Sequence, residues 1–369
     1  MPWSSPSSAL RRLGGRGPFI SPFAAFVAIV TPVACGGGEG PGFAPSPSPS
    51  APSAITRDLT LAAYTTPREA YAELLPAFAA EWKVKTGETL TFEESYQASG
   101  AQARAVIGGL EADLVALSLE PDVRKIAEAG LITHAWDQGP HQGVVTRSLV
   151  VLAVRPGNPK NIVGWADLAR PGVQVLTPNV KTSGGAMWNI AALWGASLRG
   201  HAGVPANDPA AATALLGQVL KNVAVMDKGA RESILTFEAG VGDVAITYEN
   251  EVLVAQAKAK ADGKPGMDYV VPPSTIIIEN PLALVDVVAD RHGDRAAAEA
   301  LVAYLHSAPA QAIFAAHGLR PADPALNPAA LPTPQDAFLI QDLGGWSAVQ
   351  ETVFGPNGAY AQAQAGGAQ

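Results

Sequence analysis

The sequence has a single cysteine, Cys35, in 369 residues. One cysteine excludes an intrachain disulfide. The histidines show no H-x-x-x-H or other spacing typical of metal ligands, at positions His134, His141, His201, His292, His306 and His317. We therefore expect surface or structural histidines, no metal site and no cofactor.

Charged residues are also few, at 16% of the chain. The formal net charge is −8, and residues 1–35 contribute three arginines and no acids, so the rest of the chain carries −11. Such an acidic surface argues against nucleic acid as a partner. It does not exclude a small anion, because fixed donors act at contact distance while surface charges are screened beyond roughly 8–10 Å.

After the N-terminal region, no apolar run is long enough to cross a membrane. The length nevertheless suits two domains, and a hydrophobic content of 48% suits a substantial core. These properties predict a globular protein of two domains.

Residues 1–35 have the pattern of an export signal. Arg11 and Arg12 precede a short apolar stretch at 19–34, which ends in Val-Ala-Cys-Gly at 33–36. Small residues before a cysteine are similar to a bacterial lipobox, although Pro32 departs from it. We expect export and lipid attachment at Cys35, as the only contact with the membrane. The segment 36–54 is rich in Gly, Pro and Ser, which predicts a tether.

Strand and helix patterns alternate from about residue 59 onwards, which predicts an α/β fold with largely parallel sheets. Apolar runs predict strands at 59–63, 90–92, 113–118, 148–154, 173–177, 222–226 and 242–248. Thr66 with Glu69, and Ser99 with Gln102, have the spacing of capping boxes at two helix starts. Ligands of such sheets bind at the carboxyl ends of the strands.

The turn Thr182-Ser183-Gly184-Gly185-Ala186 lies between a predicted strand and a predicted helix. Backbone N–H groups at a helix start lack intrahelical partners, and glycine lets a ligand approach the main chain. The helix dipole adds positive potential there, which favours an anion. An ordinary strand-to-helix turn would have the same sequence. Thr65, Ser99, Ala230 and Tyr248 follow other predicted strands, where a ligand would lie.

The chain resembles the sulfate-binding proteins of ABC import systems over about residues 57–323. The motifs that carry the resemblance run in unbroken order at 64–69 (YTTPRE), 95–100 (SYQASG), 109–113 (GLEAD), 155–159 (RPGNP), 182–185 (TSGG), 229–233 (GARES) and 248–251 (YENE). A Ser-Gly-Gly turn alone would not be specific to this family.

The resemblance implies a monomer with a type II periplasmic-binding-protein-like fold, in which two α/β lobes joined by two hinge crossovers close on a ligand. One lobe would comprise 56–147 and 272–341, and the other 148–271. The C-terminal segment 342–369 follows, and we expect disorder after Gly355.

The resemblance also implies the ligand contacts. These are the N–H of Thr65, the hydroxyl and N–H of Ser99, the hydroxyl of Ser183, the N–H groups of Gly184, Gly185 and Ala230, and the side chain of Tyr248. Many members have tryptophan in place of Tyr248, and arginine in place of Met187. Arg231 is a candidate replacement for that missing charge, so Met187 and Arg231 are expected to act around the site.

The expected function is an extracytoplasmic receptor that captures sulfate and delivers it to an ABC transporter permease. Sulfate needs only donors, whereas phosphate keeps a proton and rewards an acceptor carboxylate. Thiosulfate and molybdate remain alternative ligands, and a ligand-sensing module remains an alternative role. An enzyme is not expected, because the chain has no G-x-S-x-G elbow and no histidine close to these motifs.

Overall fold

The computed structural model describes residues 55–367, and the predicted export signal, lipobox cysteine and tether lie outside this range. The strands follow the order β2-β1-β3-β9-β4-β7-β5-β6, with β8 and β10 paired to β4 and β11 to β9. Their bounds are β1 (Thr56–Tyr64), β2 (Thr89–Gln97), β3 (Leu114–Ala116), β4 (Val144–Val154), β5 (Val175–Leu176), β6 (Val223–Val225), β7 (Val244–Tyr248), β8 (Asp268–Val270), β9 (Ser274–Leu284), β10 (Arg320–Pro321) and β11 (Asp336–Phe338).

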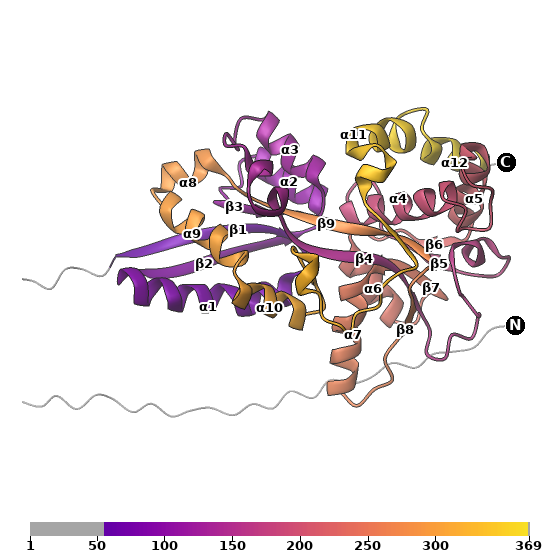
Figure 1. Cartoon of the computed structure of the whole chain (residues 1–369), viewed down its shortest axis with the longest axis horizontal. Coiled ribbons are helices and arrows are strands. Elements are labelled where there is room, and N and C mark those ends of the chain that lie inside the picture. The colour runs from indigo at the N-terminus through magenta and orange to yellow at the C-terminus, as the bar shows by residue number, and fades with distance from the viewer. Residues whose placement is uncertain (1–54, 368–369) are drawn as a thin grey trace, which may run out of the picture. The chain divides into compact units, whose positions relative to one another are not determined.

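Helices cover both faces of the strands (Figure 1), as the alternating pattern predicted. They are α1 (Arg68–Thr86), α2 (Ser99–Ile107), α3 (Glu120–Glu128), α4 (Gly184–Leu198), α5 (Pro209–Lys221), α6 (Ala230–Glu238), α7 (Glu249–Ala261), α8 (Asp286–His292), α9 (Arg295–Leu305), α10 (Ala308–Ala316), α11 (Gly345–Val349) and α12 (Ala359–Gly367). No helix among the described residues is long and apolar enough to span a membrane. The α/β fold class is therefore confirmed.

The sheet is mixed, which corrects the expectation of largely parallel strands. Strand β1 pairs in parallel with β2 and β3, and β5 pairs in parallel with β6 and β7. Strands β4 and β9 are antiparallel to each other and to the strands beside them, β7 and β3. A local apolar pattern identifies a strand but not the direction of its partner, so this arrangement could not be predicted from the apolar runs.

The pairing register makes the two parallel groups run toward each other. The end of β3 lies beside β9, with Ala116 opposite Leu282. The end of β7 lies beside β4, with Tyr248 opposite Val150. The intervening residues of β4 and β9 pair with each other, as Leu149 does with Ile277. The carboxyl ends of both groups therefore meet over the middle of the β4–β9 ribbon, which separates the groups in Figure 1.

Each parallel group has its own apolar core. Helices α1, α9 and α10 pack against the β1–β3 group, where the rings of Tyr71 and Phe314 meet edge to face at 5.7 Å. Trp165 and Trp188 lie in the largest cluster, beside β4, β5 and β7. The Trp188 ring also meets Trp346 of α11 at 4.6 Å.

The C-terminal residues differ from their predicted disorder. Residues 359–367 form α12, and Tyr360 and Ala363 on this helix are buried against the cluster that contains Trp188. Phe338 and Ile340, which fall within the range predicted for the first lobe, belong to this same cluster. The small and polar residues of 355–367 gave a weak apolar pattern, which concealed the helix.

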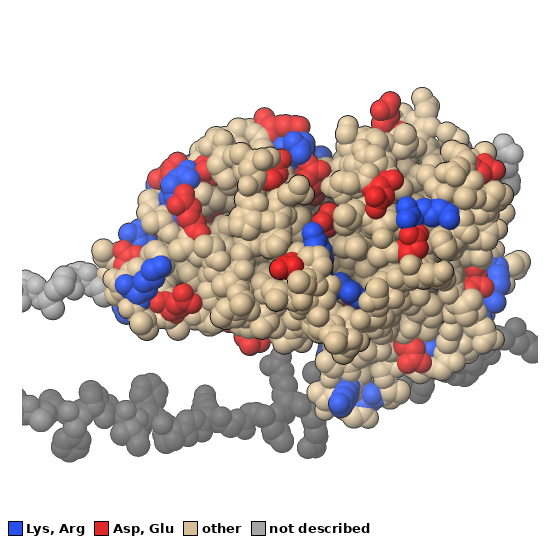
Figure 2. Space-filling model, viewed as in Figure 1, with Lys and Arg blue, Asp and Glu red and all other residues tan. Residues whose placement is uncertain are grey.

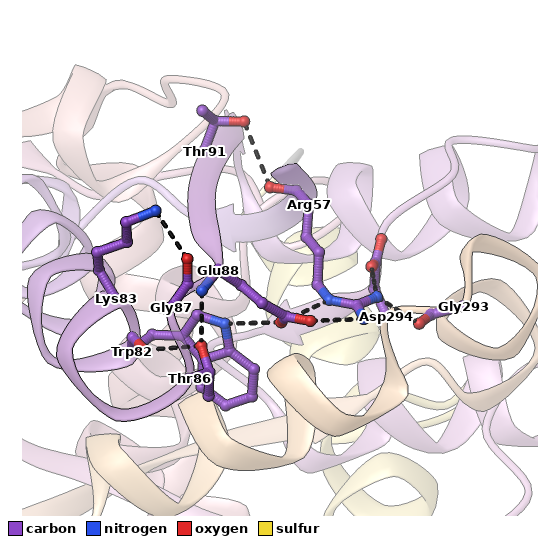
Figure 3. Close-up of polar contacts among 9 residues, drawn as sticks. All are labelled: Arg57, Trp82, Lys83, Thr86, Gly87, Glu88, Thr91, Gly293 and Asp294. Carbon is purple, nitrogen blue, oxygen red and sulfur yellow. Dashed lines mark hydrogen bonds and ion pairs between the residues drawn. The ribbon is translucent and has the colours of Figure 1, made fainter. Parts of the chain in front are cut away.

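Arg57 fixes the start of β1 to two loops (Figure 3). Its guanidinium donates to both carboxylate oxygens of Glu88, at 2.8 and 3.0 Å, and to Asp294 at 3.0 Å. It also donates to the carbonyl of Gly293 at 2.9 Å, while Trp82 donates to Glu88 at 3.1 Å. One planar side chain therefore joins the start of β1, the α1–β2 loop and the α8–α9 loop.

We expect Arg57→Ala to lower the thermal midpoint by about 2–4 °C, because it removes a bidentate pair and leaves the mostly buried Asp294 without its cation. Differential scanning calorimetry measures this shift. The matched control is Arg124→Ala, which breaks an exposed pair with Glu120 within α3 and should shift the midpoint by less than about 1 °C. Equal shifts in the two variants would contradict the anchoring role of Arg57.

Candidate functional site

The start of α4 provides two glycine N–H groups and a serine hydroxyl. Ser183 is the N-cap, and its Oγ accepts the N–H of Ala186 at 3.4 Å. Gly184 and Gly185 are the first helical residues, so their N–H groups precede the intrahelical hydrogen bonds. All three residues are buried. Because Ser183 accepts at its cap bond, its hydroxyl proton remains available for donation.

The same turn packs closely against residues from distant parts of the chain. A Cβ atom on Gly184 would lie 2.6 Å from Ser118 Oγ, and one on Gly185 would lie 2.9 Å from Tyr248 Cε2 and 3.1 Å from Ala230 Cβ. Neither position has room for a side chain. The glycines are therefore needed for this close approach, as well as for access to the main chain.

Tyr248 ends β7 and is buried, and its hydroxyl lies 2.6 Å from the hydroxyl of Ser118. Ser118 follows β3, and its carbonyl accepts from the indole of Trp188 at 2.8 Å and from Asn280 at 3.3 Å. Ser118 was not among the predicted site residues. Its position at the end of the predicted strand 113–118 was the signal that could have identified it.

Ser99 starts α2 and is buried. Its hydroxyl donates to Asp122 at 2.7 Å and accepts the N–H of Ser118 at 3.1 Å. This corrects the predicted capping box with Gln102, because Ala98 is the N-cap and a tertiary partner takes the Ser99 proton. The backbone N–H of Ser99 at the helix start is then its remaining donor.

Ala230 and Thr65 complete the predicted set. Ala230 is the first residue of α6 and lies against Gly185. Thr65 follows β1 and is linked to the other residues through its neighbours. The ring of Tyr64 lies 6.3 Å from that of Tyr248, and the carbonyl of Thr66 accepts from Arg231 at 3.2 Å.

Arg231 is held by two carboxylates. It donates to both oxygens of Glu69, at 2.6 and 2.9 Å, and to Glu251 at 2.6 Å. Burial favours a higher pKa for Glu69, but the bonds and charge of Arg231 hold that pKa below its usual value. Because Glu69 binds Arg231 and no side chain caps α1, the predicted capping box of Thr66 and Glu69 is wrong.

Met187 is partly buried and packs against the apolar cluster that contains Trp188.

The electrostatic character of these residues is that of neutral donors. Full burial raises the pKa of Tyr248, so its hydroxyl keeps its proton. The cation of Arg231 is already paired, so it does not supply an isolated positive charge.

Acidic and basic side chains are interspersed over the face of the molecule that Figure 2 shows. In residues 55–367, no group of three or more His, Cys, Asp or Glu could hold a metal ion.

The arrangement suits anion binding better than catalysis. Helix starts of α2, α4 and α6 supply partial positive charge without titratable groups. Among the described hydrogen bonds, neither Ser99 nor Ser183 has a histidine partner that could act as a base. The geometry therefore offers fixed N–H and O–H donors at one place.

Comparison with known proteins agrees with the fold. Residues 59–320 match the family described as bacterial extracellular solute-binding protein. A sulfate-binding protein of Synechococcus elongatus is 43% identical over 91% of this chain and 93% of its own length. A thiosulfate-binding protein of Pseudomonas aeruginosa is 37% identical over 81% of this chain and 90% of its own length.

A solved structure is also similar, that of the sulfate-binding protein SubI from Mycobacterium tuberculosis. It is 36% identical, has a TM-score of 0.71, and covers 81% of this chain and all of its own. The fold is accordingly the two-lobed, type II periplasmic-binding-protein fold that the motifs predicted. The chain belongs to the bacterial extracellular solute-binding proteins.

Proposed function

We propose that this protein is an extracytoplasmic receptor that captures sulfate and delivers it to the permease of an ABC importer. The observation that carries the proposal is the meeting of neutral donors from α2, α4 and α6 with Tyr248 at the facing strand ends. Relatives named as sulfate-binding proteins support the same ligand. Thr65, Ser99, Ser183, Gly184, Gly185, Ala230 and Tyr248 would hold the anion.

The donor set favours sulfate over phosphate. Sulfate is fully deprotonated at neutral pH and requires only donors, whereas phosphate keeps a proton that needs an acceptor. The nearby carboxylate, Asp122, already accepts from Ser99 and pairs with Lys125 at 3.0 Å. Each of its two oxygens thus already accepts a bond within the protein, which supports rejection of a protonated anion.

Contacts between the two predicted lobes support closure on the ligand. The lobes are 56–147 with 272–341, and 148–271. Ser118 of the first meets Tyr248 of the second, and Glu69 of the first binds Arg231 of the second. Contacts of this kind exist only while the lobes are together, so they favour the closed form.

Thiosulfate is the alternative ligand with direct support, because a relative named for it covers most of the chain. It is larger than sulfate and carries the same charge, so the same donors could bind it. Molybdate and a sensing role remain predictions of the sequence. The titration below separates the anions.

Attachment through Cys35 is part of the proposal, although this residue lies outside the described range. A lipid at Cys35 would keep the receptor beside its permease, with 36–54 as the tether that its composition predicts. We expect Cys35→Ser to move the protein from the membrane fraction to the soluble extracytoplasmic fraction, by immunoblotting. Absence of covalently bound lipid on Cys35 of the wild-type protein, by mass spectrometry, would exclude the anchor.

Isothermal titration with sulfate, thiosulfate, molybdate and phosphate tests the ligand. We expect saturable 1:1 sulfate binding with a Kd near or below about 1 μM, which corresponds to roughly −8 kcal/mol, and no phosphate binding. Absence of sulfate binding, or tighter binding of another anion, would overturn the sulfate assignment.

We expect Glu69→Gln to weaken sulfate binding by about 3–10-fold, because the closed form loses a charge-assisted pair with Arg231. Titration calorimetry measures this loss. Glu73→Gln on the same helix is the matched control, since Glu73 is exposed and pairs only with His317 among the described ion pairs. An unchanged Kd for Glu69→Gln would show that this pair does not favour closure.

A further inference from the structure

The hydroxyls of Ser118 and Tyr248 carry two protons, but the hydrogen bond between them uses only one. Their oxygens are 2.6 Å apart, and either can be the donor. Each hydroxyl carries one proton, so one proton lies between the oxygens and the other points elsewhere. If Tyr248 donates to Ser118, the Ser118 proton is free, and in the opposite direction the Tyr248 proton is free.

Ser118 and Tyr248 both lie beside the first residues of α4, whose N–H groups are candidate donors to an anion. Ser118 Oγ is 2.6 Å from the position of a Cβ on Gly184, and the Tyr248 ring is 2.9 Å from the corresponding position on Gly185. Ser118 and Tyr248 are both buried, so water does not compete freely for the second proton. The free proton is therefore available to an anion that binds beside the α4 turn.

The backbone of Ser118 is held in place from three directions. Its N–H donates to Ser99, and its carbonyl accepts from Trp188 and Asn280. These partners come from α2, α4 and β9. A residue whose backbone is fixed in this way, and whose hydroxyl is paired with Tyr248, needs little rearrangement when it binds a ligand, as expected of a recognition residue.

We propose that Ser118 is a ligand-binding residue that shares one donor position with Tyr248. The two hydroxyls act as a single unit that directs one proton to the anion, from either oxygen. Removal of one hydroxyl leaves the other free to donate, because its partner no longer takes part in the pair. This inference rests on the proposed anion-binding function and adds a residue to that site.

A double-mutant cycle on the full-length protein tests the shared donor, with sulfate as the probe in titration calorimetry. The variants are Ser118→Ala, Tyr248→Phe and the double variant, each of which removes only oxygen atoms. We expect each single variant to bind within about 3-fold of the wild type. We expect the double variant to bind about 10–100-fold more weakly, the loss typical of one hydrogen bond to a charged group.

Two controls remove buried hydroxyls elsewhere. Ser197→Ala removes a hydroxyl that donates to the carbonyl of Leu193 within α4, and Tyr71→Phe removes one in the core beneath α10. Both should leave the Kd of sulfate unchanged. Thermal unfolding of every variant without anion separates a loss of affinity from a loss of stability.

The outcomes distinguish this inference from the proposed function. If the wild type binds no sulfate, the function is wrong. If the wild type binds sulfate and Tyr248→Phe alone loses as much affinity as the double variant, Ser118 is not a donor to the anion. Losses that simply add across the cycle would show two independent hydroxyls and would equally overturn the shared donor.

Discussion

The opposed direction of two sets of parallel strands is the constraint on which the structure depends. Strands β1–β3 and β5–β7 lie at different ends of the β4–β9 ribbon and point toward its middle. Every helix that follows one of these strands therefore starts near that middle, and helix starts carry unpaired N–H groups. Two groups of donors that are far apart in sequence are brought together by strand pairing, with no long loop to position them.

The charged side chains around the α4 turn pair with one another and are not among the predicted donors to the anion. Arg231 binds Glu69 and Glu251, and Asp122 binds Ser99 and Lys125, so the nearby ions satisfy one another. The residues closest to the α4 turn present amides and hydroxyls. Fixed dipoles in a buried setting interact strongly with an anion, and they need little rearrangement when it arrives.

Much of the arrangement could be predicted from local sequence. The strand end before Thr65 and the strand that stops at Tyr248 were visible as apolar runs, whereas the apolar run at 90–92 covers only part of β2. Strand direction was not visible, because it depends on pairing with strands that are far away in the sequence. The two capping boxes failed for a related reason, since Ser99 and Glu69 bind tertiary partners that no local pattern reveals. Ser118 was missed because its place at the end of a predicted strand was its only signal, and no motif of the resemblance includes it.

The neutral donor set has a consequence for the surroundings in which such a protein works. Amide N–H groups do not titrate, and burial keeps the Tyr248 hydroxyl protonated well beyond neutral conditions. A site of this kind holds the same donors in mildly acidic and in alkaline media. An exported protein meets an environment whose acidity the cell does not control, and capture by such donors would remain constant there.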